Sequence, residues 1–251
     1  MTGLTVDSAT WIRRYHPPAP GAPEPVPLVC FPHAGGSASY FHGLSRLLSP
    51  AVGVLAVQYP GRQDRRAEAP ATDVRELAAA VVAALGPWAE RGPAYFGHSM
   101  GAAVAFEAAR LSPPSVLFVS GRRAPSASRD EAFHLLDDDG LIAETRRLDE
   151  ASAAVFADPE LRELVLPPLR ADYRAIETYR PEPDSVVEAP VEVLVGDRDP
   201  RVTEAEARAW QAHTAGEFRC TVFRDGGHFY LADRTDEVAA LVSGRLAGRS
   251  R

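Results

Sequence analysis

A serine between two glycines is the first feature of the sequence that could carry covalent chemistry. The motif GHSMG at 97–101 follows a short apolar run and precedes a helical pattern over 101–112. A strand, a sharp turn and a helix make a nucleophile elbow, whose strained turn tolerates only glycine two residues before and after the serine. The elbow would also place Ser99 at a helix N-terminus, where the N–H of Met100 can face a developing negative charge. We therefore predict that Ser99 is a nucleophile.

A serine hydroxyl needs a base to attack at neutral pH, and the chain has seven histidines. His228 lies in DGGHFYL, between the last apolar run and the last helical pattern. Loops that follow parallel strands meet at the carboxyl edge of the sheet, where Ser99 is also expected. His228 is therefore the predicted base. The helical stretches hold three more histidines, interpreted as surface residues: His42, His134 and His213.

The base needs a carboxylate that fixes its tautomer and stabilises the imidazolium. The run VEVLVGDRDP ends on two candidates, Asp197 and Asp199. We favour Asp199, whose side chain would turn inward just before Pro200, and keep Asp197 as the alternative. The resulting chain order of serine, aspartate and histidine is that of the α/β-hydrolase arrangement.

A glycine-rich loop can supply the second N–H of an oxyanion hole, beside that of Met100. The sequence FPHAGGSASYF at 31–41 follows the first long apolar run, and Ala34 or Gly35 could present its amide. A phosphate-binding interpretation fails, because the loop has neither GxxxxGK[ST] nor GxGxxG.

The elements that must position these residues alternate along the chain. Strand-like apolar runs alternate with helical patterns, which predicts an α/β fold with a mostly parallel sheet covered on both faces. The strand candidates are 28–32, 52–60, 94–97, 115–121, 191–197 and 220–226, and the helix candidates are 38–49, 72–90, 101–112, 203–213 and 233–247.

One long segment, 126–180, contains only amphipathic helical runs. Since it is too long for a simple crossover, we expect a helical lid inserted into the fold. Residues 16–27 are rich in proline and are expected to be a tail or an edge-strand region. Residues 1–26 are assigned to an N-terminal tail. The core then consists of 27–125 and 181–251.

Composition narrows the classes of partner. The formal net charge is −7, and all 27 basic residues are arginine, so a nucleic acid or an anionic membrane is not the expected partner. Cys30 and Cys220 have no metal-binding spacing, and no run approaches 18 apolar residues. We expect a cytoplasmic protein without a metal.

Taken together, these motifs resemble a known family. FPHAGGSASYF, QYPGRQDR, YFGHSMGA, LPPLRADYRAIETY, GDRDPRV and DGGHFYL occur in this order over about residues 26–247. The sequence looks like the standalone type II thioesterases that accompany polyketide and nonribosomal peptide synthases in antibiotic biosynthesis. At 146–155, RRLDEASAAV replaces the glycine-containing turn expected between lid helices.

The resemblance implies an α/β-hydrolase that removes stalled or wrong acyl units from the phosphopantetheine arm of acyl or peptidyl carrier proteins. It implies no cofactor, since the substrate carries the phosphopantetheine, and we expect a monomer. The family triad carries over to Ser99, Asp199 and His228, and the oxyanion amides to Met100 and Ala34.

Two questions stay open at this point. Arg62, Arg65 and Arg66 follow the second strand candidate, and they form either a solvated turn or a positive patch for the phosphopantetheine phosphate or an acidic carrier. The alternative functions are a general carboxylesterase, a chain-releasing thioesterase, or a non-catalytic carrier-binding module.

Overall fold

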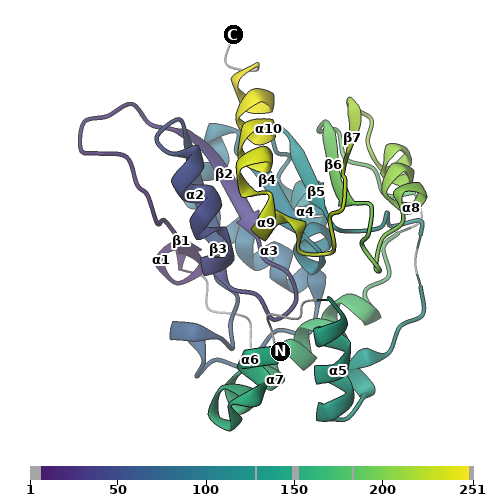
Figure 1. The fold of residues 1–251 in the computed structure, drawn as a ribbon. Coiled ribbons are helices and arrows are strands. Elements are labelled where there is room, and N and C mark those ends of the chain that lie inside the picture. Colours follow the sequence, from purple (N-terminus) through teal and green to yellow (C-terminus); the bar gives the residue numbers. More distant parts are fainter. Residues whose placement is uncertain (1–6, 128, 149–152, 183, 249–251) are drawn as a thin grey trace.

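A single twisted sheet organises the computed structural model, which describes residues 7–127, 129–148, 153–182 and 184–248. Its strands follow the order β1-β3-β2-β4-β5-β6-β7 (Figure 1). The short β1 runs antiparallel to β3, and all other neighbours are parallel. The strands are β1 (Ile12–Arg13), β2 (Val26–Phe31), β3 (Val52–Val57), β4 (Ala94–His98), β5 (Leu117–Ser120), β6 (Val191–Gly196) and β7 (Phe218–Phe223).

Helices cover both faces of this sheet, because successive strand residues point to opposite sides and both sets are apolar. In β2, Val29 and Phe31 pack with α3 (Val74–Leu85) and α4 (Met100–Leu111). Leu28 and Cys30 of the same strand pack with α2 (His42–Leu48) and α10 (Thr235–Ala247). The predicted α/β layering is confirmed.

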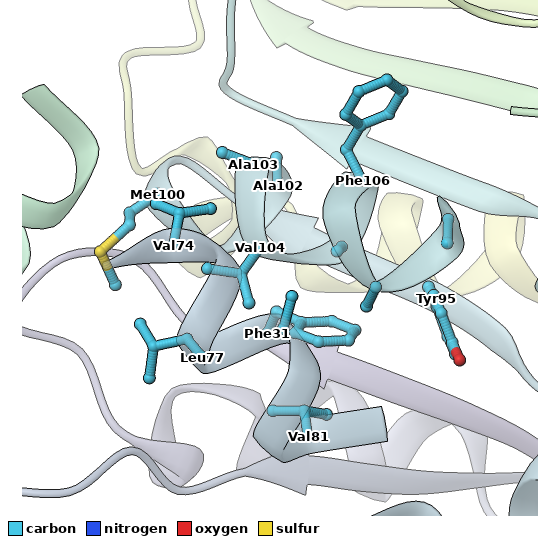
Figure 2. Close-up of a cluster of buried hydrophobic side chains, with 14 of the residues drawn as sticks. Phe31, Val74, Leu77, Val81, Tyr95, Met100, Ala102, Ala103, Val104 and Phe106 are labelled. Atoms are coloured by element: carbon cyan, nitrogen blue, oxygen red, sulfur yellow. The ribbon is translucent and has the colours of Figure 1, made fainter. Parts of the chain in front are cut away.

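The core between the sheet and α4 is close-packed. Figure 2 shows the small residues Ala102 and Ala103 of α4 together with Val74, Leu77 and Val81 of the neighbouring α3. Ala102 is fully buried, so its small side chain lets α4 lie directly against the sheet. This close approach fixes the start of α4, where the nucleophile is expected.

Two short elements occur where the sequence suggested a tail. Helix α1 (Ser8–Trp11) begins at Asp7, whose side chain accepts a hydrogen bond from the N–H of Thr10, and β1 pairs with β3. Trp11 is fully buried against the core. A two-residue strand leaves no periodic pattern in a sequence, so it could not be predicted from one.

The insertion between β5 and β6 is helical, as expected. It contains α5 (Asp138–Leu148), α6 (Ala153–Ala157) and α7 (Pro159–Thr178), which lie together beneath the carboxyl ends of the strands (Figure 1). Its own apolar cluster comprises Leu141, Ile142, Phe156, Leu166, Leu169 and Tyr173. Residues 149–152 of the unusual turn lie outside the described residues, and the division into tail, core and lid stays a prediction.

The shorter elements are α8 (Glu204–Arg208), α9 (Tyr230–Asp233) and the 3₁₀ turns η1 (Ala38–Phe41), η2 (Gln63–Arg65), η3 (Gly86–Arg91), η4 (Phe133–Leu135) and η6 (Ala209–His213). Within the described ranges, no helix combines the length and apolar character needed to cross a membrane.

Candidate active site

Ser99 occupies a strained turn between β4 and α4. Its φ of 55° and ψ of −117° place it in a region that non-glycine residues rarely adopt. Its N–H donates to the carbonyl of Ser120 on β5 at 2.8 Å, which ties the turn to the next strand. The side chain is partly exposed while its neighbours His98 and Met100 are buried. The predicted elbow is therefore present in the fold.

The two glycines of the motif are required by close backbone approach. A Cβ on Gly97 would lie 2.3 Å from the carbonyl oxygen of Gly101, and one on Gly101 would lie 2.0 Å from that of Phe31. Both distances are far below van der Waals contact, so any larger residue would push α4 away from the sheet.

His228 lies between Ser99 and Asp199. Its Nε2 is 3.0 Å from the Ser99 Oγ, and its Nδ1 is 2.9 Å from Oδ2 of Asp199. Both His228 and the Asp199 carboxylate are buried, and the N–H of Arg201 donates to Asp199 at 2.8 Å. Asp197, the alternative acid, instead lies 3.6 Å from Arg224. The order serine, histidine, aspartate is the geometry of a catalytic triad.

The loops after β6 and β7 meet through glycines. A Cβ on Gly196 would lie 2.1 Å from the carbonyl oxygen of Gly226. The N–H of Arg198 donates to that same carbonyl at 2.9 Å. This contact brings Asp199 and His228 together although 28 residues separate them in the chain.

The loop after β2 lies beside Ser99. Ala34 lines the pocket that also contains Ser99 and Met100. The N–H of Gly35 donates to Asp172 at 2.7 Å, so it is not free to hold an oxyanion. Of the two candidates, Ala34 is therefore the better supported, with Met100 at the first position of α4.

Behind the triad lies a buried polar and aromatic cluster. The His98 ring is 5.3 Å from that of His228, and its Nδ1 is hydrogen-bonded to Ser120 at 2.8 Å. The hydroxyl of Ser120 is also hydrogen-bonded to the hydroxyl of Tyr230. Burial, and then the charge of His228, lowers the pKa of His98 well below its usual value. His98 is therefore held in its neutral form.

The pocket beside Ser99 has a charged wall that the sequence did not indicate. Arg123 and Arg201 both pair with Glu131, and Arg201 also pairs with Glu144 of α5. Burial, and then the charge of Arg123, lowers the pKa of Arg122 to about 9, so it stays protonated at neutral pH. The other lining residues include Gly121, Leu148, Tyr173, Ile176, Glu177, Val202 and His228.

Both interpretations of Arg62 and Arg65, a solvated turn and a positive patch, are wrong, because the two side chains are buried. Arg62 is buried and makes a two-pronged ion pair with Asp172, at 2.6 and 2.8 Å. Arg65 is also buried: it donates to the carbonyl of Gln58 at 2.7 Å, and its guanidinium stacks 4.3 Å over Trp11. Only Arg66 of the three is exposed.

Two histidines predicted to lie at the surface, His134 and His213, are instead partly or fully buried. His213 is buried, its Nδ1 lies 2.9 Å from the carbonyl of Ser185, and its Nε2 accepts from the N–H of Ser126. His134 is hydrogen-bonded to Glu177. Both histidines bond to residues in or next to the insertion, and Glu177, the partner of His134, also lines the pocket beside Ser99.

Comparison with known proteins identifies a family that is consistent with the arrangement of Ser99, His228 and Asp199. A family model described as a thioesterase domain matches residues 26–246. The chain belongs to the thioesterase family. Thioesterase PikA5 of Streptomyces venezuelae is 51% identical over 97% of this chain and 88% of its own.

Two solved thioesterases share the fold. The type II thioesterase BorB from the borrelidin biosynthetic cluster is 46% identical, with a TM-score of 0.86 over 97% of this chain and 100% of its own. RedJ, a thioesterase from the prodiginine pathway in Streptomyces coelicolor, is 37% identical, with a TM-score of 0.82 over 91% and 92%. This thioesterase therefore has the α/β-hydrolase fold and is a serine hydrolase of the type II class found in polyketide and nonribosomal peptide biosynthesis.

Proposed function

We propose that this thioesterase hydrolyses acyl groups from the phosphopantetheine arm of acyl or peptidyl carrier proteins, clearing aberrant or stalled units, with Ser99 as the nucleophile. The observation that carries the proposal is the hydrogen-bonded line from Ser99 through His228 to Asp199. The kinship with a type II thioesterase from a biosynthetic cluster supports the substrate class.

In the first half-reaction, the Ser99 Oγ attacks the thioester carbonyl carbon while His228 Nε2 takes the hydroxyl proton. The N–H groups of Met100 and Ala34 stabilise the oxyanion, and each donor of this kind contributes about 2.7–4 kcal/mol in comparable enzymes. When the intermediate collapses, the C–S bond breaks. His228 then returns the proton to the departing sulfur, which leaves an acyl-Ser99 ester and a free pantetheine thiol.

In the second half-reaction, water replaces the thiol. His228 takes a proton from the water as its oxygen attacks the acyl carbon, and the second intermediate releases the carboxylic acid and returns the proton to Ser99. In both half-reactions Asp199 orients the imidazole and stabilises its positive form. Every bond-making step thus uses residues of this chain.

The insertion of α5–α7 would serve as a lid, since its Tyr173 and Ile176 line the same pocket as Ser99. Arg66 stays a candidate contact for a carrier or its phosphate, because it is exposed in the segment that follows β3. The monomeric state and the cytoplasmic location remain predictions.

One acyl group offered in two forms tests the proposal. Wild type and Ser99→Ala would be compared on the acyl group carried by a holo-carrier protein and on its p-nitrophenyl ester. We expect wild type to prefer the carrier thioester and Ser99→Ala to lose both activities. Equal or faster turnover of the oxyester would indicate a general esterase, and no turnover of either would favour a binding module.

A further inference from the structure

We propose that Asp172 of α7 is a positioning residue for the oxyanion loop, residues 33–37, and so makes the lid part of the catalytic apparatus. The proposal rests on the proposed function, in which the N–H of Ala34 stabilises the oxyanion. Its basis is that one buried carboxylate of the insertion is bonded both to this loop and to Arg62 of the core.

The bonds hold two peptide groups of the loop, Ala34–Gly35 and Gly36–Ser37. Oδ2 of Asp172 accepts from the N–H of Gly35 at 2.7 Å and from Nη1 of Arg62 at 2.6 Å. The same Nη1 donates to the carbonyl of Gly36 at 3.0 Å. The ion pair of Asp172 and Arg62 thus holds both an N–H and a C=O of the loop.

The loop needs this support because of its composition. Gly35 has a φ of 75°, and consecutive glycines leave the backbone many alternative conformations. The peptide unit that contains the Gly35 N–H also contains the Ala34 carbonyl, so fixing it restricts the rotation of Ala34. Leu169, one turn before Asp172 on α7, adds an apolar contact, since a Cβ on Gly35 would lie 2.7 Å from its Cδ1.

The ion pair of Arg62 and Asp172 is buried and two-pronged, which restricts the motion of both side chains. The side chains of Arg62 and Asp172 are only 7% and 1% exposed, and the two terminal guanidinium nitrogens, Nη1 and Nη2, both donate to the carboxylate. Burial alone would lower the pKa of Arg62, but the adjacent carboxylate outweighs it and raises that pKa. A buried carboxylate held by two hydrogen bonds from one guanidinium has a fixed orientation, which it imposes on the Gly35 amide.

A test must separate positioning from stability. Removing one partner of a buried pair is strongly destabilising, whereas replacing both by apolar residues is often neutral. We therefore choose Asp172→Asn and the double variant Arg62→Met/Asp172→Leu. The matched control is Glu107→Gln, since Glu107 is a buried carboxylate that bonds Tyr179 at 2.7 Å and pairs with Arg110, away from the loop.

The substrate would be an acyl N-acetylcysteamine thioester, which requires no carrier, and thermal unfolding would be measured for each variant. We expect kcat to fall by about 10- to 100-fold in both Asp172 variants with KM changed by less than about threefold, because an oxyanion donor acts mainly in the transition state. The control should keep the wild-type kcat.

A folded double variant with the kcat of wild type would overturn the positioning role and leave the proposed function intact. So would a parallel loss of kcat in Glu107→Gln. Failure of wild type to hydrolyse any thioester, by contrast, would overturn the proposed function and this inference with it.

Discussion

At the scale of single residues, the site depends on which carboxylate reaches the base. Asp199 contacts His228 with both oxygens, at 3.0 and 2.9 Å, and is held in turn by the N–H of Arg201. Asp197, two residues earlier, has a side chain that is 27% exposed and faces Arg224. We therefore propose that Asp199, and not Asp197, orients the imidazole.

This assignment predicts different outcomes for two similar substitutions. Asp199→Asn should lower kcat by about 10⁴-fold, because the amide would favour the wrong tautomer of the base. Asp197→Asn should change kcat less than about twofold, since its carboxylate lies outside the triad. Steady-state hydrolysis of one thioester by both variants would decide, and equal losses in the two variants would contradict the assignment.

The triad could be predicted from sequence because each member follows a strand-like run and comes with a recognisable turn. Asp172 and Arg62 could not, because nothing in a sequence shows that two residues 110 positions apart form a pair. One signal was available: Asp172 is an acid on the apolar stripe of α7 that contains Leu169 and Ile176. A carboxylate in such a place is buried only when it is paired.

At the scale of elements, the close contact of α4 with the sheet fixes the position of Ser99 at the start of the helix. Gly101→Ala would place a Cβ 2.0 Å from the carbonyl oxygen of Phe31, and rigid backbone cannot relieve such an overlap cheaply. We expect the free energy of unfolding to fall by more than about 3 kcal/mol, the upper range for single substitutions.

A second glycine provides the control for this prediction. Gly244 lies inside α10, and a Cβ there would meet no atom within 4 Å. Gly244→Ala should raise stability by about 0.4–1 kcal/mol, because alanine favours the helix. Urea unfolding of both variants measures the difference, and similar stabilities would show that the backbone contact at Gly101 is not restrictive.

Element types were predictable because buried parallel strands are short apolar runs bounded by turns, as in Val191–Gly196 and Ala94–His98. The helical nature of the insertion was equally clear. The contacts of the insertion with the core could not be predicted. The burial of Arg62, for example, depends on the position of α7 in the fold. The two-residue β1 gave no pattern at all.

At the scale of the whole molecule, buried histidines link stability to pH. Burial, then the charges of His228 and Arg62, lowers the pKa of His33 to about 3, and His98 is also lowered. Below about pH 6.5 the unfolded chain binds protons at these histidines while the folded chain does not. The contribution of these histidines to the free energy of unfolding is therefore complete above about pH 6.5 and is lost as the pH falls.

The expected slope is about 1.4 kcal/mol per pH unit for each such histidine between about pH 6 and pH 4. Urea unfolding over this range should show stability falling as the pH falls, and His33→Asn should reduce the slope by up to that amount. An unchanged slope in the variant would mean that His33 titrates normally in the folded protein.

The most direct test of the central claim is to trap the acyl-enzyme. Wild type would be mixed with a stoichiometric acyl-carrier thioester and quenched within one turnover, and the acyl mass would be located by peptide mass spectrometry. We predict an acyl group on Ser99 that is absent from Ser99→Ala. An acyl group on another residue, or hydrolysis that persists in Ser99→Ala, would contradict the account.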